Sequence, residues 1–218
     1  MTTKTNILLV DDHAIVREGL SSLIEQHQGF LVSAQAESVE NALALLQRQT
    51  FDIAIVDLSL NKQNGLDLVK DITRQYPETR VLVFSMHPEE IYAERALRAG
   101  AKGYLMKSES PETLLVAINK LLDGMVYLSD RMTKMLLGNA MASGKQRTAT
   151  SFGVQALSDR ELEIFTLVGK GHPSKEIALR LRLSVKTVDA VRQNIKNKLG
   201  FQCASELVKF AIEYANSL

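Results

Sequence analysis

Short apolar runs alternate with segments of helical periodicity through the first half of the chain. Each run has the length of a strand, and between the runs apolar residues recur three or four positions apart, as on one face of a helix. Strands that alternate with amphipathic helices predict a parallel sheet covered on both faces by right-handed crossovers. We therefore expect an α/β, doubly wound domain over residues 1–124. The five predicted strands are residues 6–10, 30–36, 52–56, 80–85 and 102–106.

In residues 157–218 the pattern is wholly helical. Ser158 and Glu161 have the spacing of a capping box at the start of a first helix. Ser174 is expected to cap a second helix, and Ser184 a third. A turn of three residues joins the second helix to the third, which is the arrangement of a helix-turn-helix. With one further helix at the carboxyl end, this stretch predicts a small all-α domain of four helices.

Residues 125–156 separate the two patterns. Ser129 is placed to cap a short helix, after which Gly, Ser, Thr and basic residues follow without periodicity. This composition predicts a flexible linker that lets the two domains dock or separate.

Charge is distributed unevenly, although the total is only +1. Residues 1–124 hold 12 Lys and Arg against 17 Asp and Glu, residues 125–156 hold 4 against 1, and residues 157–218 hold 10 against 7. An acidic front half suits a cation or a docking protein, and a basic rear half suits a polyanion. No apolar run has the length of a membrane span and the amino terminus lacks a signal-peptide pattern, so we expect a cytoplasmic protein without membrane association. The single cysteine, Cys203, excludes an internal disulfide.

Polar side chains stand where the predicted strands end. Asp11 and Asp12 follow the first strand, Asp57 the third, Ser85 the fourth and Lys107 the fifth. Because the carboxyl ends of parallel strands meet at one edge of the sheet, we expect these side chains to converge. Carboxylates in one crevice raise one another's pKa unless a cation binds, and Mg²⁺ prefers oxygen ligands. Taken singly, the aspartates read as helix caps and the lysine as a solvated loop charge, but the set predicts a magnesium site.

This set, in this order, resembles the receiver domain of two-component response regulators, a flavodoxin-like fold, over residues 6–124. The resemblance implies that Asp57 accepts a phosphoryl group from a sensor histidine kinase, with Mg²⁺ as cofactor. It implies further that Asp12 binds Mg²⁺ directly, Asp11 largely through water, and Ser59 through its backbone carbonyl.

The same resemblance assigns roles to three other side chains. Lys107 and Ser85 are expected to contact the phosphoryl group, and Tyr104 is expected to turn inward behind Ser85 as part of a two-state switch. From the residues alone, Tyr104 is equally well an aromatic on an edge strand. The Met-Pro pair that many receivers carry after the phosphoacceptor strand is absent here, while Gly65 is expected to keep the turn.

The predicted third helix of the rear domain has two different faces. Val188, Val191, Ile195 and Leu199 form an apolar face. The opposite face is polar, with side chains small enough to enter a major groove. The residues expected to contact DNA are Ser174, Lys175, Ser184, Lys186, Thr187, Asp189, Ala190, Arg192, Gln193, Lys196 and Lys198.

The string GHPSKEIALRLRLSVKTVDAVRQNIKNKLG resembles the LuxR-type helix-turn-helix, and together with the receiver it resembles the NarL/FixJ family of response regulators. Ser174 stands where that family usually has Asn, Val191 where it has His or Tyr, and Asp189 where a basic or polar residue is common. Val191 extends the apolar face. Asp189 is repelled by phosphates unless it accepts a hydrogen bond from a cytosine amino group.

These patterns predict a phosphorylation-dependent, sequence-specific transcription regulator that binds double-stranded DNA as a homodimer when phosphorylated. The resemblance implies no catalysis beyond Mg²⁺-dependent phosphoryl transfer to its own Asp57 and slow autodephosphorylation. One alternative keeps the receiver but has a rear domain that docks protein rather than DNA. A second, an aspartyl-phosphate phosphatase, needs a further acid two residues after its nucleophile, where this chain has Ser59.

Overall fold

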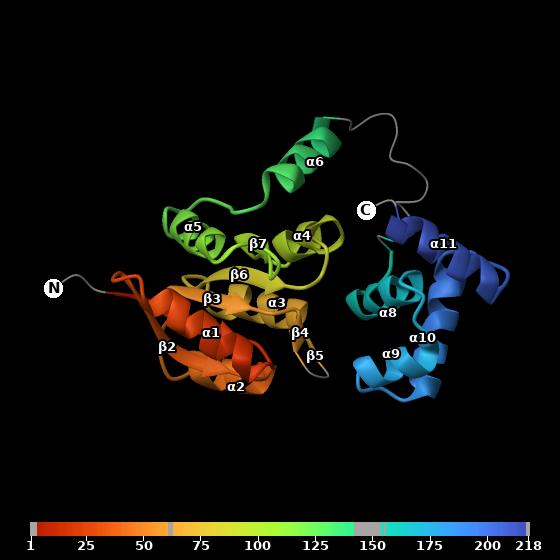
Figure 1. Cartoon of the computed structure of the whole chain (residues 1–218), viewed down its shortest axis with the longest axis horizontal. Coiled ribbons are helices and arrows are strands. Elements are labelled where there is room, and N and C mark those ends of the chain that lie inside the picture. The colour runs from red at the N-terminus through yellow and green to blue at the C-terminus, as the bar shows by residue number, and fades with distance from the viewer. Residues whose placement is uncertain (1–3, 61–62, 142–153, 155, 217–218) are drawn as a thin grey trace. The chain divides into compact units, whose positions relative to one another are not determined.

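The five predicted apolar runs form one parallel sheet (Figure 1). Its strand order is β2-β1-β3-β6-β7. Val10 pairs with Val56, and Val56 pairs with Val83, so the central strands reach the same edge of the sheet. The strands are β1 (Thr5–Val10), β2 (Phe30–Ala36), β3 (Ile53–Val56), β6 (Arg80–Ser85) and β7 (Gly103–Met106).

Two compact units make up the chain, Met1–Leu137 and Gly138–Leu218. In the part of the chain that is described, no helix has the length and apolar character of a membrane span. This computed structural model describes residues 4–60, 63–141, 154 and 156–216.

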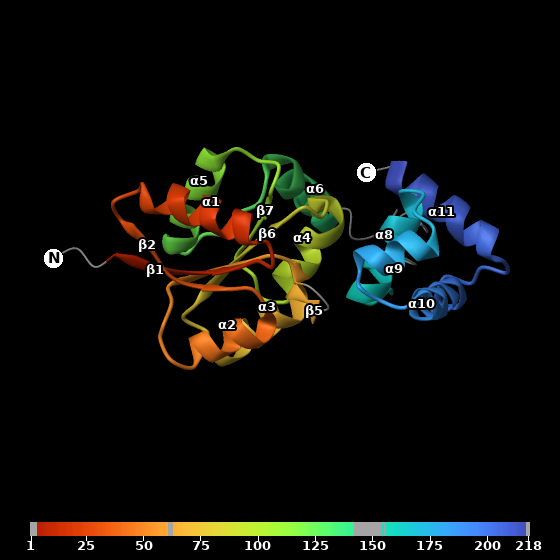
Figure 2. The same ribbon diagram turned by 60° about the horizontal axis from the view of Figure 1, so that its bottom comes forward.

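Helices cover both faces of the sheet, with α1 and α5 on one face and α2 and α3 on the other (Figure 2). α4 packs against α3 and β7. Beneath α1 and α5, the buried strand residues Leu9 and Ile55 belong to the same core as Ile24 and Ile118 of the two helices. Each such side chain contributes about 1.5–3 kcal/mol when it is fully buried. The helices are α1 (Ala14–Glu25), α2 (Val39–Leu46), α3 (Gly65–Gln75), α4 (Glu89–Arg98) and α5 (Pro111–Leu122).

A short antiparallel hairpin follows β3, and the sequence analysis does not predict it. β4 (Ser59–Leu60) pairs with β5 (Gln63–Asn64), and α3 begins directly afterwards at Gly65. Gly65 is therefore a helical residue and not the turn residue that we expected. A Cβ at this position would lie 2.2 Å from the backbone oxygen of Asp57. Glycine is required because the start of α3 passes directly against the backbone that carries that aspartate.

The segment that follows α5 packs onto the first unit, where the sequence analysis predicts a linker. Tyr127 pairs with the outer edge of β7. α6 (Asp130–Met141) begins after Ser129, whose Oγ accepts a hydrogen bond of 3.0 Å from the first turn of that helix. The first unit extends to Leu137, which lies within α6. Residues 142–153 and 155 of the predicted linker lie outside the described residues.

Over residues 157–216 the second unit consists of the helices α8, α9, α10 and α11, as the helical pattern predicts. Each of these four helices contacts at least two others of the set. Their bounds are α8 (Asp159–Gly169), α9 (Ser174–Arg180), α10 (Val185–Lys198) and α11 (Ala204–Asn216).

Two of the three predicted caps in this unit are present. Ser158 and Glu161 form a capping box at the start of α8. Ser184 Oγ caps α10 by accepting a hydrogen bond of 3.0 Å from the backbone N–H of Thr187. The prediction for Ser174 is wrong, because Pro173 holds the N-cap position and Ser174 is the first residue of α9, without a capping hydrogen bond from its side chain.

Candidate functional site

Two buried carboxylates and one ammonium meet at the carboxyl ends of β1, β3 and β7. Asp11 and Asp57 are each 3% exposed. Lys107 Nζ lies 2.5 Å from Asp11 Oδ2 and 2.7 Å from Asp57 Oδ2. The sheet brings the two aspartates together because the residues before them, Val10 and Val56, are paired. The lysine is therefore a buried partner of both carboxylates and not a solvated loop charge.

Burial and charge act against each other in this cluster. Burial raises the pKa of the Asp57 carboxyl above its usual value, although the Lys107 ammonium acts to lower it. Burial alone would lower the pKa of Lys107, but the charges of Asp57 and Asp11 outweigh it, so the pKa is raised. With Asp12, three carboxylates stand against one ammonium, and this excess of negative charge favours a divalent cation.

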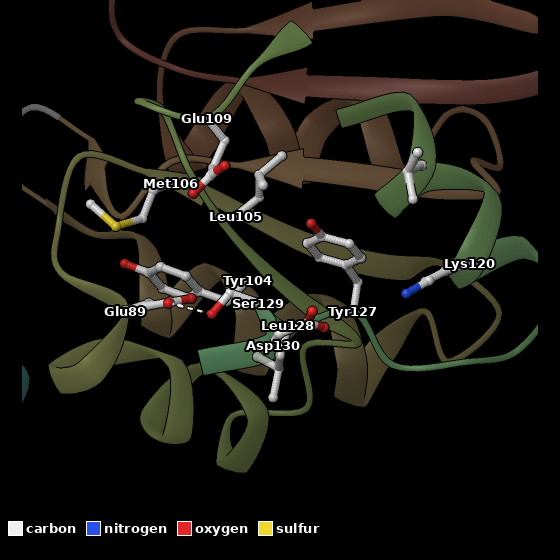
Figure 3. Close-up of a pocket in the computed structure, with 11 residues that line it drawn as sticks. Glu89, Tyr104, Leu105, Met106, Glu109, Lys120, Tyr127, Leu128, Ser129 and Asp130 are labelled. Carbon is white, nitrogen blue, oxygen red and sulfur yellow. Dashed lines mark hydrogen bonds between the residues drawn. The ribbon is translucent and has the colours of Figure 1, made fainter. Parts of the chain in front are cut away.

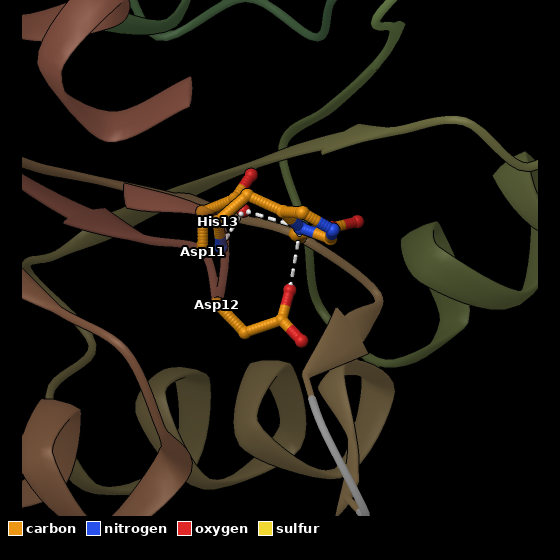
Figure 4. A group of neighbouring side chains, drawn as sticks. Asp11, Asp12 and His13 are labelled. Carbon is orange, nitrogen blue, oxygen red and sulfur yellow. Dashed lines mark hydrogen bonds and ion pairs between the residues drawn. The ribbon is translucent and has the colours of Figure 1, made fainter. Parts of the chain in front are cut away.

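Asp12 and His13 complete the group of side chains at this edge (Figure 4). One ligand atom from each of Asp11, Asp12, His13 and Asp57 lies within 4.8 Å of the others. His13 Nδ1 is 2.7 Å from Asp12 Oδ1 and 3.3 Å from Asp11 Oδ1. This imidazole is not among the predicted site residues, and its position directly after the acid pair is the sequence signal that points to it. His13 is also the N-cap residue of α1, so the acid pair does not occupy that position.

Ser59 contacts Asp57 directly, and Ser59 and Tyr104 both contact His87 in the loop that follows β6. Ser59 donates its backbone N–H to Asp57 Oδ1 at 3.2 Å, and its hydroxyl lies 3.0 Å from His87 Nε2. Ser85 is fully buried at the end of β6. Tyr104 is fully buried too, and its hydroxyl donates to the backbone oxygen of His87 at 2.8 Å. Burial raises the pKa of the Tyr104 phenol well above its usual value, so the hydroxyl keeps its proton and remains a donor.

The predicted DNA-reading face of α10 is open to solvent. Val188 and Ile195 are buried and Val191 is half-buried, as expected for the apolar face. The exposed members of the predicted DNA-contacting set are Lys175, Ser184, Lys186, Thr187, Asp189, Ala190, Gln193 and Lys198.

Several cations of this unit are tied to neighbouring elements. Arg192 Nη1 donates to Ser174 Oγ at 2.7 Å, which joins α10 to the start of α9. Lys196 Nζ donates at 3.3 Å to a backbone oxygen in the segment between α10 and α11. Lys198, although exposed, lies 2.7 Å from Glu161 Oε2 of α8. These contacts hold α10 against its neighbours, and the sequence analysis did not predict them.

A doubly wound parallel sheet with this acid cluster and buried lysine, followed by a helix-turn-helix unit, defines the class of response regulators with a DNA-binding output domain. The response regulator receiver domain matches residues 7–119, and the luxR family of bacterial regulatory proteins matches residues 155–211. The chain belongs to the NarL/FixJ family of two-component response regulators.

Two relatives match nearly the whole chain, and a third matches about two thirds of it. The oxygen regulatory protein NreC of Staphylococcus aureus (strain MRSA252) is 37% identical over 209 residues, which are 95% of this chain and 96% of NreC. A LuxR-family two-component response regulator from Aurantimonas sp. SI85-9A1 is 35% identical with a TM-score of 0.60, and the match covers 64% of this chain and 99% of that one. RcsB from Salmonella enterica serovar Typhimurium, bound to promoter P1flhDC in the presence of the phosphomimetic BeF3−, is 25% identical with a TM-score of 0.62. The match covers 96% of this chain and 98% of that one.

Proposed function

We propose that the chain regulates transcription in response to phosphorylation, and that Asp57 accepts the phosphoryl group from a sensor histidine kinase. The observation that carries the proposal is the contact of Lys107 with both Asp11 and Asp57 in a buried site. An Asp57 oxygen forms a bond to phosphorus while the bond from phosphorus to the kinase's histidine nitrogen breaks, and the nitrogen keeps the electron pair. Lys107 is placed to offset negative charge on the phosphoryl oxygens.

Asp11, Asp12 and Asp57 would hold Mg²⁺, with the backbone carbonyl of Ser59 as a further ligand. Carboxylate and carbonyl oxygens are the ligands this ion takes, and the excess of carboxylates over ammonium in the cluster fits its charge. When bound, the ion would offset the negative charge on the phosphoryl group during its transfer. The backbone N–H of Ser59 orients Asp57 through its hydrogen bond to Oδ1.

Ser85 and Tyr104 form the proposed switch. A phosphoryl group on Asp57 offers a hydrogen-bond acceptor to the Ser85 hydroxyl. The new hydrogen bond draws the start of the loop between β6 and α4 inward. Tyr104 holds the same loop through the backbone oxygen of His87. A displacement that begins at Ser85 therefore reaches Tyr104 through a loop of a few residues.

The exposed face of α10 is the proposed DNA-reading surface. Lys186, Asp189, Ala190 and Gln193 would reach base edges in the major groove, while the exposed Lys175 and the other cations near this face contact phosphates. DNA binding by this class of protein is supported by RcsB, whose solved complexes include one on promoter DNA and one of two dimers on two parallel DNAs. We infer that the phosphorylated chain binds a two-fold DNA site as a homodimer, in the cytoplasm, where chromosomal DNA lies.

The test compares the DNA affinity of the full chain before and after treatment with a small phosphodonor and Mg²⁺. We expect tighter binding after treatment, no response in Asp57→Asn, and an affinity that falls steeply with salt because counterions are released from DNA. Labelling that persists in Asp57→Ala would contradict the assignment of the site. DNA affinity that is weak and nearly independent of salt would favour the alternative in which the second unit docks a protein.

A further inference from the structure

The chain that leaves α5 is attached to the strand that carries Tyr104. The backbone N–H of Tyr127 donates to Lys102 O at 2.9 Å, and the backbone N–H of Tyr104 donates to Tyr127 O at 3.0 Å. Gly103, between them, has no room for a side chain, because a Cβ there would lie 3.2 Å from Tyr127 Cβ and 2.8 Å from a methyl group of Leu82. The backbone around Tyr127 is thus held along the outer edge of β7.

Two residues later, Ser129 joins this segment to the start of α4. Its hydroxyl donates to Glu89 Oε1 (Figure 3). Ser129 Oγ in turn accepts a hydrogen bond of 3.0 Å from the backbone N–H of Met132. Glu89 is 9% exposed and is the first residue of α4, whereas Met132 lies in the first turn of α6. One hydroxyl therefore connects the first turns of two helices, and its single proton is committed to Glu89.

A second contact joins the same two helices. Arg131 of α6 lies 2.8 Å from Glu90 of α4, with the Glu90 side chain 13% exposed. Beside these contacts is a cavity of about 290 Å³ that Glu89, Tyr104, Tyr127 and Ser129 help to line. The cavity leaves open space beside the Ser129–Glu89 contact, whereas Met132 in the first turn of α6 is buried and has to move with that turn.

The attachment of Tyr127 to β7 and the attachment of Ser129 to α4 both lead to the loop between β6 and α4. Ser85 ends β6, Glu89 begins α4, and the Tyr104 hydroxyl bonds to His87 between them. If this loop moves when Asp57 is phosphorylated, Glu89 moves with it. The Ser129 hydroxyl must then follow Glu89 or leave a largely buried carboxylate without this donor, and the second outcome is costly.

We propose that Ser129 is a coupling residue, which converts displacement of the β6–α4 loop into displacement of the amino-terminal turn of α6. The inference rests on the proposed function, because the displacement begins with the phosphoryl group on Asp57. It assigns to Ser129 a task that differs from capping α6. A cap needs only an acceptor for the Met132 N–H, whereas coupling needs the donor to Glu89.

Three variants of the full chain separate these tasks. Ser129→Asp keeps an acceptor suited to a helix cap but removes the donor to Glu89 and sets two carboxylates against each other. Ser129→Thr keeps both the acceptor and the donor. Ser38→Ala is the matched control, since Ser38 caps α2 through Asn41.

The measurement is amide hydrogen exchange of residues 130–137 in the full chain, with Mg²⁺ alone and with Mg²⁺ plus the phosphoryl mimic BeF3−. In the wild type, Ser129→Thr and Ser38→Ala, the mimic should change exchange in this segment by about two- to tenfold, the factor that corresponds to one net hydrogen bond. In Ser129→Asp the change should vanish, while labelling of Asp57 by a small phosphodonor stays at the wild-type level.

The outcomes are distinguishable. A full change of exchange in Ser129→Asp would overturn the coupling role and leave Ser129 as a cap only. Unchanged exchange in the wild type, with Asp57 labelled normally, would overturn the coupling and leave the phosphoacceptor assignment intact. A chain whose Asp57 takes no label would overturn the proposed function, and the coupling with it.

Discussion

Lys107 and Asp57 form a buried ion pair, with 2.7 Å between Nζ and Oδ2 and 10% of the lysine side chain exposed. Asp11 shares the same ammonium at 2.5 Å. One cation thus holds together two buried carboxylates that otherwise repel each other. The stability of the cation-free domain depends on this lysine, because a buried charge that loses its partner is far more costly than an exposed one.

Replacing Lys107 with Ala should therefore lower the free energy of unfolding by about 3–5 kcal/mol at neutral pH without Mg²⁺. Urea denaturation measures the change, and added Mg²⁺ should restore part of the loss because it supplies positive charge to the same carboxylates. Lys70→Ala is the control. Lys70 pairs with Asp67 at 2.9 Å but is 53% exposed, so its removal should cost at most about 1 kcal/mol. Equal stability of Lys107→Ala and the wild type would contradict the importance of this pair.

We expect His13 to compete with a cation for Asp12. Its Nδ1 lies 2.7 Å from Asp12 Oδ1, while 66% of the imidazole is exposed. His13→Ala should tighten Mg²⁺ binding about two- to fivefold, the factor that corresponds to an exposed ion pair. Titration calorimetry with MgCl₂ measures this, with His27→Ala as the control because that ring stacks on Phe30. Weaker binding by His13→Ala would instead show that the imidazole supports the bound ion.

The strand positions and the convergence of the site follow from sequence for a physical reason. A strand buried on both faces requires a continuous apolar run, and the predicted run 80–85 coincides with β6. Parallel topology then places Asp11, Asp57 and Lys107 at one edge. The hairpin after β3 does not follow, because each of its strands has two residues and so carries no periodic signal.

Contacts between distant side chains have no sequence signal either. The bond from Arg192 to Ser174 joins residues on two helices, and nothing in the spacing of either helix indicates it. The attachment of Tyr127 to β7 depends on the exit direction of α5, which composition does not encode. Sequence therefore predicts which edge of the sheet carries the site, while the ties that connect this edge to α6 require the structure.

Glu161 should make the second unit sensitive to acid. Burial acts to raise the pKa of its carboxyl, but hydrogen bonds from Lys198 and Ser158 outweigh burial, so the pKa lies below its ordinary value of 4.5. A carboxyl whose pKa is lower in the folded state binds fewer protons there than in the unfolded state. Its contribution to stability is therefore complete above the ordinary value and is lost as pH falls through the folded pKa.

Glu161→Gln should consequently flatten the loss of stability of this unit below about pH 4.5, the range in which linkage acts on this carboxyl. The measurement is the urea midpoint of the transition that belongs to the second unit, followed over pH in the full chain. Glu163→Gln removes another carboxylate of α8, one that pairs with Arg160 a turn away, and serves as the control. Parallel pH profiles of Glu161→Gln and the wild type would contradict the role of the Lys198 contact.

Replacing Asp189 tests which face of α10 enters the major groove. It is exposed on α10, as are Lys186, Ala190 and Gln193. If its carboxylate accepts from a cytosine amino group, Asp189→Ala should lose roughly 1–3 kcal/mol of discrimination at one base pair in each half-site. Binding to unrelated DNA should tighten, because a charge that repels phosphates is removed while the cations that set the salt dependence remain.

Binding assays on a set of operators with single base changes, repeated at several salt concentrations, measure both effects. Glu213→Ala is the control, since it removes one negative charge from the same unit but from α11. If Asp189→Ala binds every sequence more tightly and keeps the preference at every position, the carboxylate acts only by repulsion. If neither kind of binding changes, α10 does not enter the groove by this face, because an exposed charge at a DNA backbone must alter affinity.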